Sequence, residues 1–252
     1  MEELLETLVV YAFLGLLILL RLDTRRFSAA EHDDEDAGGL GVWLRRLSWY
    51  AFGIGLVVLI YRLYPLPISE LHLQLGDDRA QAIVLGLSLG ALGTLVALGW
   101  AYLRLGGLAL PPVRRYPAGV LNSVCTALID EAAFRGIMLG LMLAADWPVE
   151  LAIATQAVLY GLITRLAARD RPFGMLLLSL AIGALGGWLT VLTGGIGASF
   201  LGHALTRFAL FVSTGHAGLL RSPTEEEPPP DADELTPEGW EIVSDRGPGR
   251  SW

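Results

Sequence analysis

Long apolar runs constrain this chain more than any other feature of its sequence. Each run approaches the roughly 20 residues that a helix needs to cross about 30 Å of hydrocarbon. Within lipid, only helices and closed barrels satisfy every backbone hydrogen bond, and no alternating-strand pattern appears in the sequence. We therefore predict an all-α, polytopic transmembrane helical bundle of about seven spans, at residues 4–20, 42–61, 81–103, 118–144, 151–168, 174–192 and 196–214.

The composition supports a membrane protein whose net negative charge lies in its tail. Hydrophobic residues make up 53% of the chain and charged residues 17%, whereas soluble domains carry about 25% charged residues. The stretch from Ser222 to Trp252 holds nine acidic residues and two arginines, and so accounts for most of the net charge of −8. Because a polyanionic tail repels phosphate backbones, we expect the lipid bilayer as a partner and no nucleic acid.

Four segments follow from this organisation. We predict a first transmembrane helix at residues 1–22, an acidic loop at 23–40, a transmembrane core at 41–217 and an acidic, proline-rich, disordered tail at 218–252. The loops after spans one, three and five hold eleven arginines, Arg21 among them, against two on the opposite side. The arginine-rich side should be cytoplasmic, which predicts an external N-terminus and a cytoplasmic tail.

Five ionisable residues lie where the membrane interior should be. Asp130, Glu131 and Arg135 are near the middle of the fourth span, and His203 and Arg207 are near the middle of the seventh. A charge at this depth costs about 2.5–3.5 kcal/mol, so these side chains should face the protein interior. A buried salt bridge that only holds helices in register is one explanation for them.

The spacing in the fourth span says more about these charges. Glu131 and Arg135 are four residues apart, so they share a helical face and can form an ion pair. Asp130 is rotated by about 100° and should point toward a neighbouring helix. One arginine cannot neutralise two adjacent carboxylates, so the surplus negative charge requires a metal ion, a proton or another cation.

These residues resemble the motifs of the CAAX protease and bacteriocin-processing family of intramembrane metalloproteases, also called CPBP or Abi. Members of that family share Glu-Glu-x-x-x-Arg in one span, Phe-x-x-x-His in the next and His-x-x-x-Asn in a late span. Here Asp130, Glu131 and Arg135 match the first motif with Asp in the leading position, and His203 falls on the late histidine. The resemblance covers roughly residues 80–215.

Two motifs depart from the family pattern. In the fifth span Tyr160 occupies the Phe position and Thr164 stands where the histidine is expected, while Arg207 replaces the late Asn. Both changes put the activity in doubt without affecting the expected fold.

The resemblance implies that the acids and histidines bind a metal ion or activate a water that attacks a peptide carbonyl. Catalytic zinc generally uses three protein ligands and an open position. With Thr164 in place of a histidine, Asp130, Glu131 and His203 remain as possible zinc ligands. Arg207 would repel a divalent cation nearby, so a site without a cofactor is the alternative.

Three functions are compatible with these residues. The first is a CPBP-type endopeptidase that hydrolyses a membrane-associated or lipidated substrate, with Glu131 as general base, Arg135 holding it, and Asp130 and His203 as ligands or water-positioning groups. The second is a catalytically degenerate member that binds a membrane partner, with Arg207 paired to the acids. The third is a small transporter or channel, since buried carboxylates also mark ion paths. Each would be an integral protein of a prokaryotic plasma membrane.

Overall fold

The computed structural model describes residues 2–27, 40–65, 67–108, 110–167 and 173–215. Within these ranges all regular structure is helical, as the apolar runs predict. Most of the predicted acidic loop and the whole predicted tail at 218–252 fall outside the described residues.

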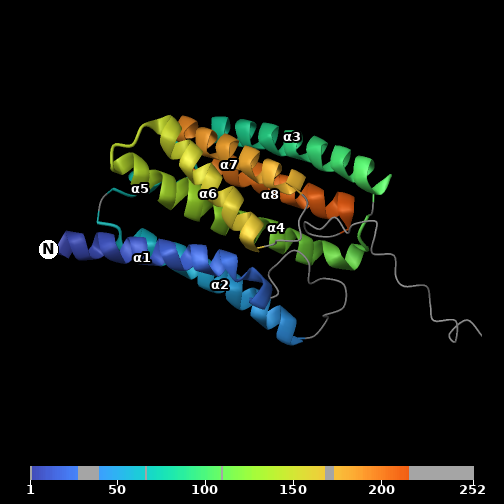
Figure 1. The fold of residues 1–252 in the computed structure, drawn as a ribbon, viewed down its shortest axis with the longest axis horizontal. Helices are drawn as coiled ribbons and strands as arrows, with labels where there is room; N and C mark the ends of the chain where they lie inside the picture. Colours follow the sequence, from blue (N-terminus) through green and yellow to red (C-terminus); the bar gives the residue numbers. More distant parts are fainter. Residues whose placement is uncertain (1, 28–39, 66, 109, 168–172, 216–252) are drawn as a thin grey trace, which may run out of the picture. The chain divides into compact units, whose positions relative to one another are not determined.

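A helix corresponds to each of the seven predicted spans (Figure 1). Six of them are uninterrupted helices: α1 (Glu2–Leu22), α2 (Leu40–Leu63), α3 (Arg79–Leu105), α6 (Val149–Ala167), α7 (Phe173–Thr193) and α8 (Gly197–Thr214). Among the described helices, α1, α2, α3, α6 and α7 are long and apolar enough to cross a membrane. The chain is thus a helical membrane bundle.

The fourth predicted span is a helix whose middle is π-helical. It consists of α4 (Tyr116–Asp130), a π-helical segment (Glu131–Met138) and α5 (Leu139–Ala144). Every residue of the π-helical segment is buried. π-helical turns are rare and often occur at functional sites. Here the change of helix type begins at the acidic motif, between Asp130 and Glu131.

Helices α1, α2, α6, α7 and α8 all contact this fourth span. α1 packs against α2, and α1 also contacts α6 and the π-helical segment. α3 lies along α8, and α7 contacts both α6 and α8 (Figure 1). Side chains from α1, α6, α7 and α8 can therefore meet at the middle of the fourth span.

Glycines in α7 allow α6 to approach its backbone closely. Nε2 of Gln156 in α6 donates a hydrogen bond to the carbonyl of Gly183 in α7 at 2.7 Å. A Cβ added to Gly183 would lie 2.9 Å from Cα of Ala157. Small residues at such crossings are typical of membrane helices, where close packing replaces the hydrophobic effect as the source of association.

Replacing Gly183 with alanine should therefore destabilise the α6–α7 packing. We expect a loss of about 1–3 kcal/mol, because the added methyl group meets backbone that cannot move aside. Gly99→Ala in α3 is the matched control, because nothing lies within 4 Å of a Cβ at that position. Thermal unfolding in detergent would measure both; equal midpoints for the two variants would contradict this packing.

Candidate functional site

Glu131 and His203 meet in the interior of the bundle. Nδ1 of His203, on α8, lies 2.7 Å from Oε1 of Glu131, on the fourth span. The Glu131 side chain has no exposed surface and that of His203 is 2% exposed. The convergence predicted for an acid and an imidazole from two spans is therefore present in the structure.

Arg135 and Tyr160 complete this contact. Nη1 of Arg135 lies 3.1 Å from Oε1 of Glu131, as the spacing of four residues predicted. The same guanidinium lies over the ring of Tyr160, with Cζ 4.1 Å from the ring centroid. The hydroxyl of Tyr160 is 3.2 Å from Nε2 of His203. Tyr160, which occupies the position of the family's Phe, thus joins α6 to the site through both its ring and its hydroxyl group.

Asp130 faces away from Glu131 and pairs with a residue of the first helix. Its Oδ1 lies 2.9 Å from Nε of Arg21, in the last turn of α1. The Arg21 side chain is 7% exposed and that of Asp130 has no exposed surface. This confirms that Asp130 points toward a neighbouring helix, and it identifies another cation that compensates the second carboxylate.

The assignment of Arg21 to a cytoplasmic loop is therefore wrong. Arg21 and Arg46 lie within helices and are buried, although both were counted as loop arginines. A basic residue at the end of a span can turn back into the protein when an acid there needs a partner. The other arginines counted near the span ends still number nine against two, although Arg45, Arg104 and Arg165 also lie within helices.

Gly186 of α7 forms the wall beside the free oxygen of Glu131. A Cβ added to Gly186 would lie 3.6 Å from Oε2 of Glu131, 3.3 Å from Nε of Arg135 and 3.4 Å from Cβ of Ser199. Oε2 and Nε are both buried, and neither makes a direct hydrogen bond within the described residues; Ser199 is the further side chain that interacts with Glu131. An acceptor and a donor with unused hydrogen-bonding capacity thus both lie close to the Cα of Gly186, where that residue has no side chain.

Arg207 belongs to a second polar layer, one helical turn from His203. Its Nη2 donates a hydrogen bond to Oδ1 of Asn122 at 2.9 Å, and Nδ2 of Asn122 donates to the hydroxyl of Tyr50 at 3.0 Å. The network joins α8, α4 and α2. The ion pairs that the structure shows at the motif acids come from Arg21 and Arg135, whereas the partner-binding hypothesis had named Arg207 for this role.

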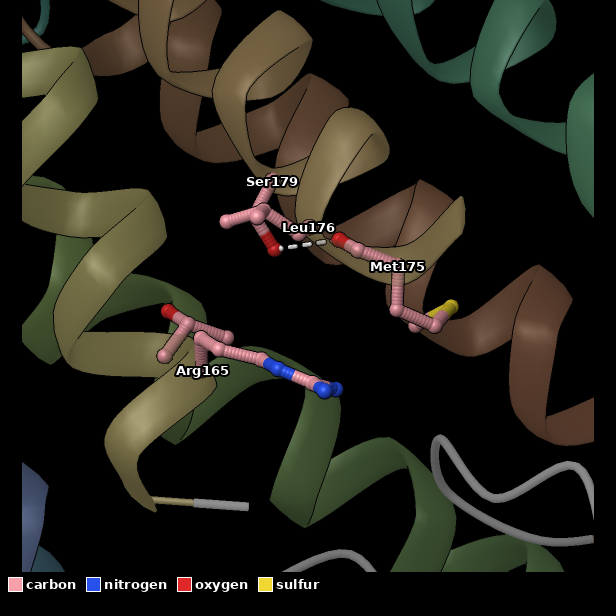
Figure 2. A pocket seen from close by; sticks show the side chains of 5 residues that line it. Arg165, Met175, Leu176 and Ser179 are labelled. Atoms are coloured by element: carbon pink, nitrogen blue, oxygen red, sulfur yellow. Dashed lines mark hydrogen bonds between the residues drawn. The ribbon is translucent and has the colours of Figure 1, made fainter. Parts of the chain in front are cut away.

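Thr164 lies in a small hollow between α6 and α7. Its hydroxyl is buried and has no hydrogen-bond partner among the described residues. Figure 2 shows Arg165 of α6 on one side of this hollow and Met175, Leu176 and Ser179 of α7 on the other. The hydroxyl of Ser179 donates to the carbonyl of Met175 at 2.8 Å. The contact to His203 from α6 is made by Tyr160, one turn before Thr164.

The predicted zinc ligands do not form a three-ligand set. The described residues contain no group of three or more His, Cys, Asp or Glu side chains that could hold a metal ion. Asp130 is turned toward Arg21, and Oε1 of Glu131 is shared by Arg135 and His203. Because a guanidinium already lies against each carboxylate, this donor set does not fit a divalent cation.

Arg21 and Tyr160 are the site residues that sequence reasoning missed. The sequence carries a signal for each. Two adjacent carboxylates with a single arginine demanded a further cation, and Arg21 is the arginine at the end of a neighbouring span. Tyr160 was noted only as a departure from the family pattern, although a phenol in the fifth span can supply a polar group to the interior.

Replacing Arg135 should destabilise the bundle strongly. Arg135→Met would leave the Glu131 carboxylate buried without its guanidinium, and losing one partner of such a pair costs about 3–5 kcal/mol. Arg62→Met is the control, because Arg62 lies exposed in the last turn of α2. Thermal unfolding of the purified full chain would compare them; an unchanged midpoint for Arg135→Met would show that the pair does not support the fold.

Comparison with known proteins agrees with the motifs. Residues 112–209 match the family model described as type II CAAX prenyl endopeptidase Rce1-like. A search of curated proteins and a search of solved structures found no match. The matched range contains Asp130, Glu131, Arg135 and His203, whereas Arg21 lies before it. Over residues 112–209, this chain is similar to the Rce1-like family of type II CAAX prenyl endopeptidases, in agreement with the CPBP resemblance.

Proposed function

We propose that this protein is an intramembrane endopeptidase that hydrolyses a peptide bond of a membrane-associated substrate. The single observation that carries the proposal is the pair of unused groups beside Gly186. Oε2 of Glu131 can accept a proton there, and Nε of Arg135 can donate a hydrogen bond. Peptide hydrolysis needs both: a base for the water and a donor for the tetrahedral oxyanion.

The surrounding contacts suit Glu131 to the role of general base. A carboxylate on Nδ1 of His203 favours the tautomer that carries its proton there, which leaves Nε2 free to accept from the hydroxyl of Tyr160. His203 thus holds Oε1 and turns Oε2 toward Gly186. His203 and Tyr160 are positioning residues in this scheme, since they act through the orientation of Glu131.

The hydrolytic step then follows from these positions. A water beside Gly186 gives a proton to Oε2 of Glu131 as its oxygen attacks the carbonyl carbon of the peptide. The oxyanion that forms accepts a hydrogen bond from Nε–H of Arg135. When the intermediate collapses, the C–N bond breaks and the proton on Glu131 passes to the leaving amine. General base catalysis of this kind contributes about 10²–10⁴-fold to the rate.

The membrane location favours a substrate held in or at the bilayer. Glu131 lies at the middle of a helix that runs from Tyr116 to Ala144, and the site residues are buried. The excess of arginines near the span ends on one side favours an external N-terminus and a cytoplasmic C-terminus. We expect a lipidated peptide that enters from the cytoplasmic side, of the prenylated CAAX class that the family's description indicates.

A degenerate, partner-binding member is the second candidate. It is favoured by the two short ion pairs, which place a guanidinium against each carboxylate. It is also favoured by Thr164, which stands at the histidine position of the family's second motif. In this version the same contacts only hold α1, α8 and the fourth span together. The two candidates differ in whether Glu131 is needed for hydrolysis or only for stability.

Glu131→Gln tests the endopeptidase directly. Glutamine keeps the size of the side chain and can accept the His203 hydrogen bond, but it cannot take a proton from water. We expect cleavage of a prenylated CAAX peptide in proteoliposomes to fall by at least about 10²-fold. Glu70→Gln is the matched control, because that carboxylate accepts from the hydroxyl of Tyr64 outside the site. Undiminished cleavage by Glu131→Gln would exclude the proposed base, and absence of cleavage by the unaltered protein would favour the degenerate member.

Gly186→Ala tests where the reaction takes place. Its methyl group would fill the space beside Oε2 of Glu131 and Nε of Arg135 at contact distances of 3.3–3.6 Å. We expect the folded variant to lose about tenfold or more in cleavage rate, since displaced reacting groups cost rates of this order. Gly99→Ala should cleave like the unaltered protein. A fully active Gly186→Ala enzyme would place the water elsewhere.

A further inference from the structure

Each carboxylate of the acidic motif has its own guanidinium, and the two guanidinium groups come from different helices. Arg135 lies 3.1 Å from Glu131 within the fourth span, and Arg21 of α1 lies 2.9 Å from Asp130. Arg21 precedes the matched family segment, which begins at residue 112. A residue from outside the family domain therefore completes the charge balance inside it.

The position of Arg21 follows from how α1 is held in the bundle. One face of α1 is buried in the second half of the helix, through Val10, Leu14, Leu17 and Leu20. This apolar stripe at helical spacing turns the face that carries Arg21 toward the core. At the end of the helix, Nε1 of Trp49 in α2 donates to the carbonyl of Leu20 at 3.0 Å. The Arg21–Asp130 ion pair is thus formed from the end of α1 that this hydrogen bond holds in place.

The charge of Arg21 changes what the acidic pair can bind. Two adjacent carboxylates in a low-dielectric interior attract cations strongly. A guanidinium stays protonated at all ordinary pH values, so Arg21 gives Asp130 a permanent counter-charge in the folded protein. A divalent ion at the motif would have to displace Arg21 or lie beside it against electrostatic repulsion.

We infer that Arg21 is a positioning residue that takes the electrostatic place of a metal ion at Asp130 and makes α1 part of the site. The ion pair keeps Asp130 turned toward α1, which leaves Glu131 to His203 and Arg135. The inference concerns charge and position, so it does not depend on whether the protein cleaves peptides.

Removing the guanidinium should create a metal site that the unaltered chain lacks. In Arg21→Met the Asp130 carboxylate is uncompensated and can turn toward Glu131 and His203, which are zinc ligands by type. With Zn²⁺ alone as the probe, we expect the full-length variant in detergent to bind at least about tenfold more tightly than the unaltered protein. We also expect Zn²⁺ to raise the unfolding midpoint of the variant, and Arg21→Met/Asp130→Asn to lose this response.

The same variants separate charge compensation from simple packing. Without zinc, Arg21→Met should unfold about 10 °C lower because it leaves a buried charge, and the double variant should recover part of the loss. Arg26→Met is the control, since Arg26 pairs with Asp23 while 82% exposed, and it should behave like the unaltered protein. Should Arg21→Met fail to fold, recovery in the double variant still supports the inference.

Two results would overturn it. One is additive destabilisation by Arg21→Met and Asp130→Asn, which would show that the two side chains do not interact. The other is tight zinc binding by the unaltered protein that Asp130→Asn abolishes, which would show that Asp130 holds a metal ion despite Arg21. None of these readouts measures cleavage, so a failure of the proposed endopeptidase activity would be seen separately.

Discussion

A carboxylate at the middle of a membrane span has to be compensated within the protein, because the surrounding lipid offers no water and no counter-ion. The arrangement around Glu131 follows from this constraint. Its Oε1 faces both the imidazole of His203 and the guanidinium of Arg135. The first contact fixes α8 against the fourth span, and the second brings in α6, because the same guanidinium lies over the ring of Tyr160. The same contacts therefore fix both the packing of the three helices and the orientation of the Glu131 carboxylate.

The neighbouring acid is compensated separately, because adjacent helical residues are rotated by about 100° from each other. Helical geometry changes between Asp130 and Glu131, and the two carboxylates face different helices. Asp130 is held by Arg21 of α1, while Oε2 of Glu131 keeps unused hydrogen-bonding capacity beside Gly186. One acid is thus engaged in holding α1, and the other keeps an oxygen available for chemistry. This division explains how an acidic pair can serve the fold and an active site together.

Much of this could be predicted from the sequence, because span length and helical spacing are local properties. The seven helices, the Glu131–Arg135 pair and the direction of Asp130 follow from hydrophobic runs and from the 100° rotation between residues. The convergence of Glu131 with His203 followed from the cost of burying charge. Arg21 could not be predicted as the partner of Asp130, since basic residues at span ends ordinarily lie in cytoplasmic loops.

The predicted three-ligand zinc site was wrong for the same reason: the second cation came from a helix distant in the sequence. Neither the π-helical segment nor the bond between Arg207 and Asn122 leaves a pattern that a single sequence reveals.

In this site the Glu131 carboxylate holds the imidazole of His203 by its Nδ1–H group. Solid-state ¹⁵N NMR of histidine-labelled protein in bilayers tests it most directly, with the His203 signals among the four histidines identified by their loss in His203→Gln. The account predicts a protonated Nδ1 and an unprotonated Nε2 at neutral pH, with the Nδ1 signal shifted in Glu131→Gln. A proton on Nε2 with none on Nδ1, or an Nδ1 signal indifferent to Glu131→Gln, would contradict it.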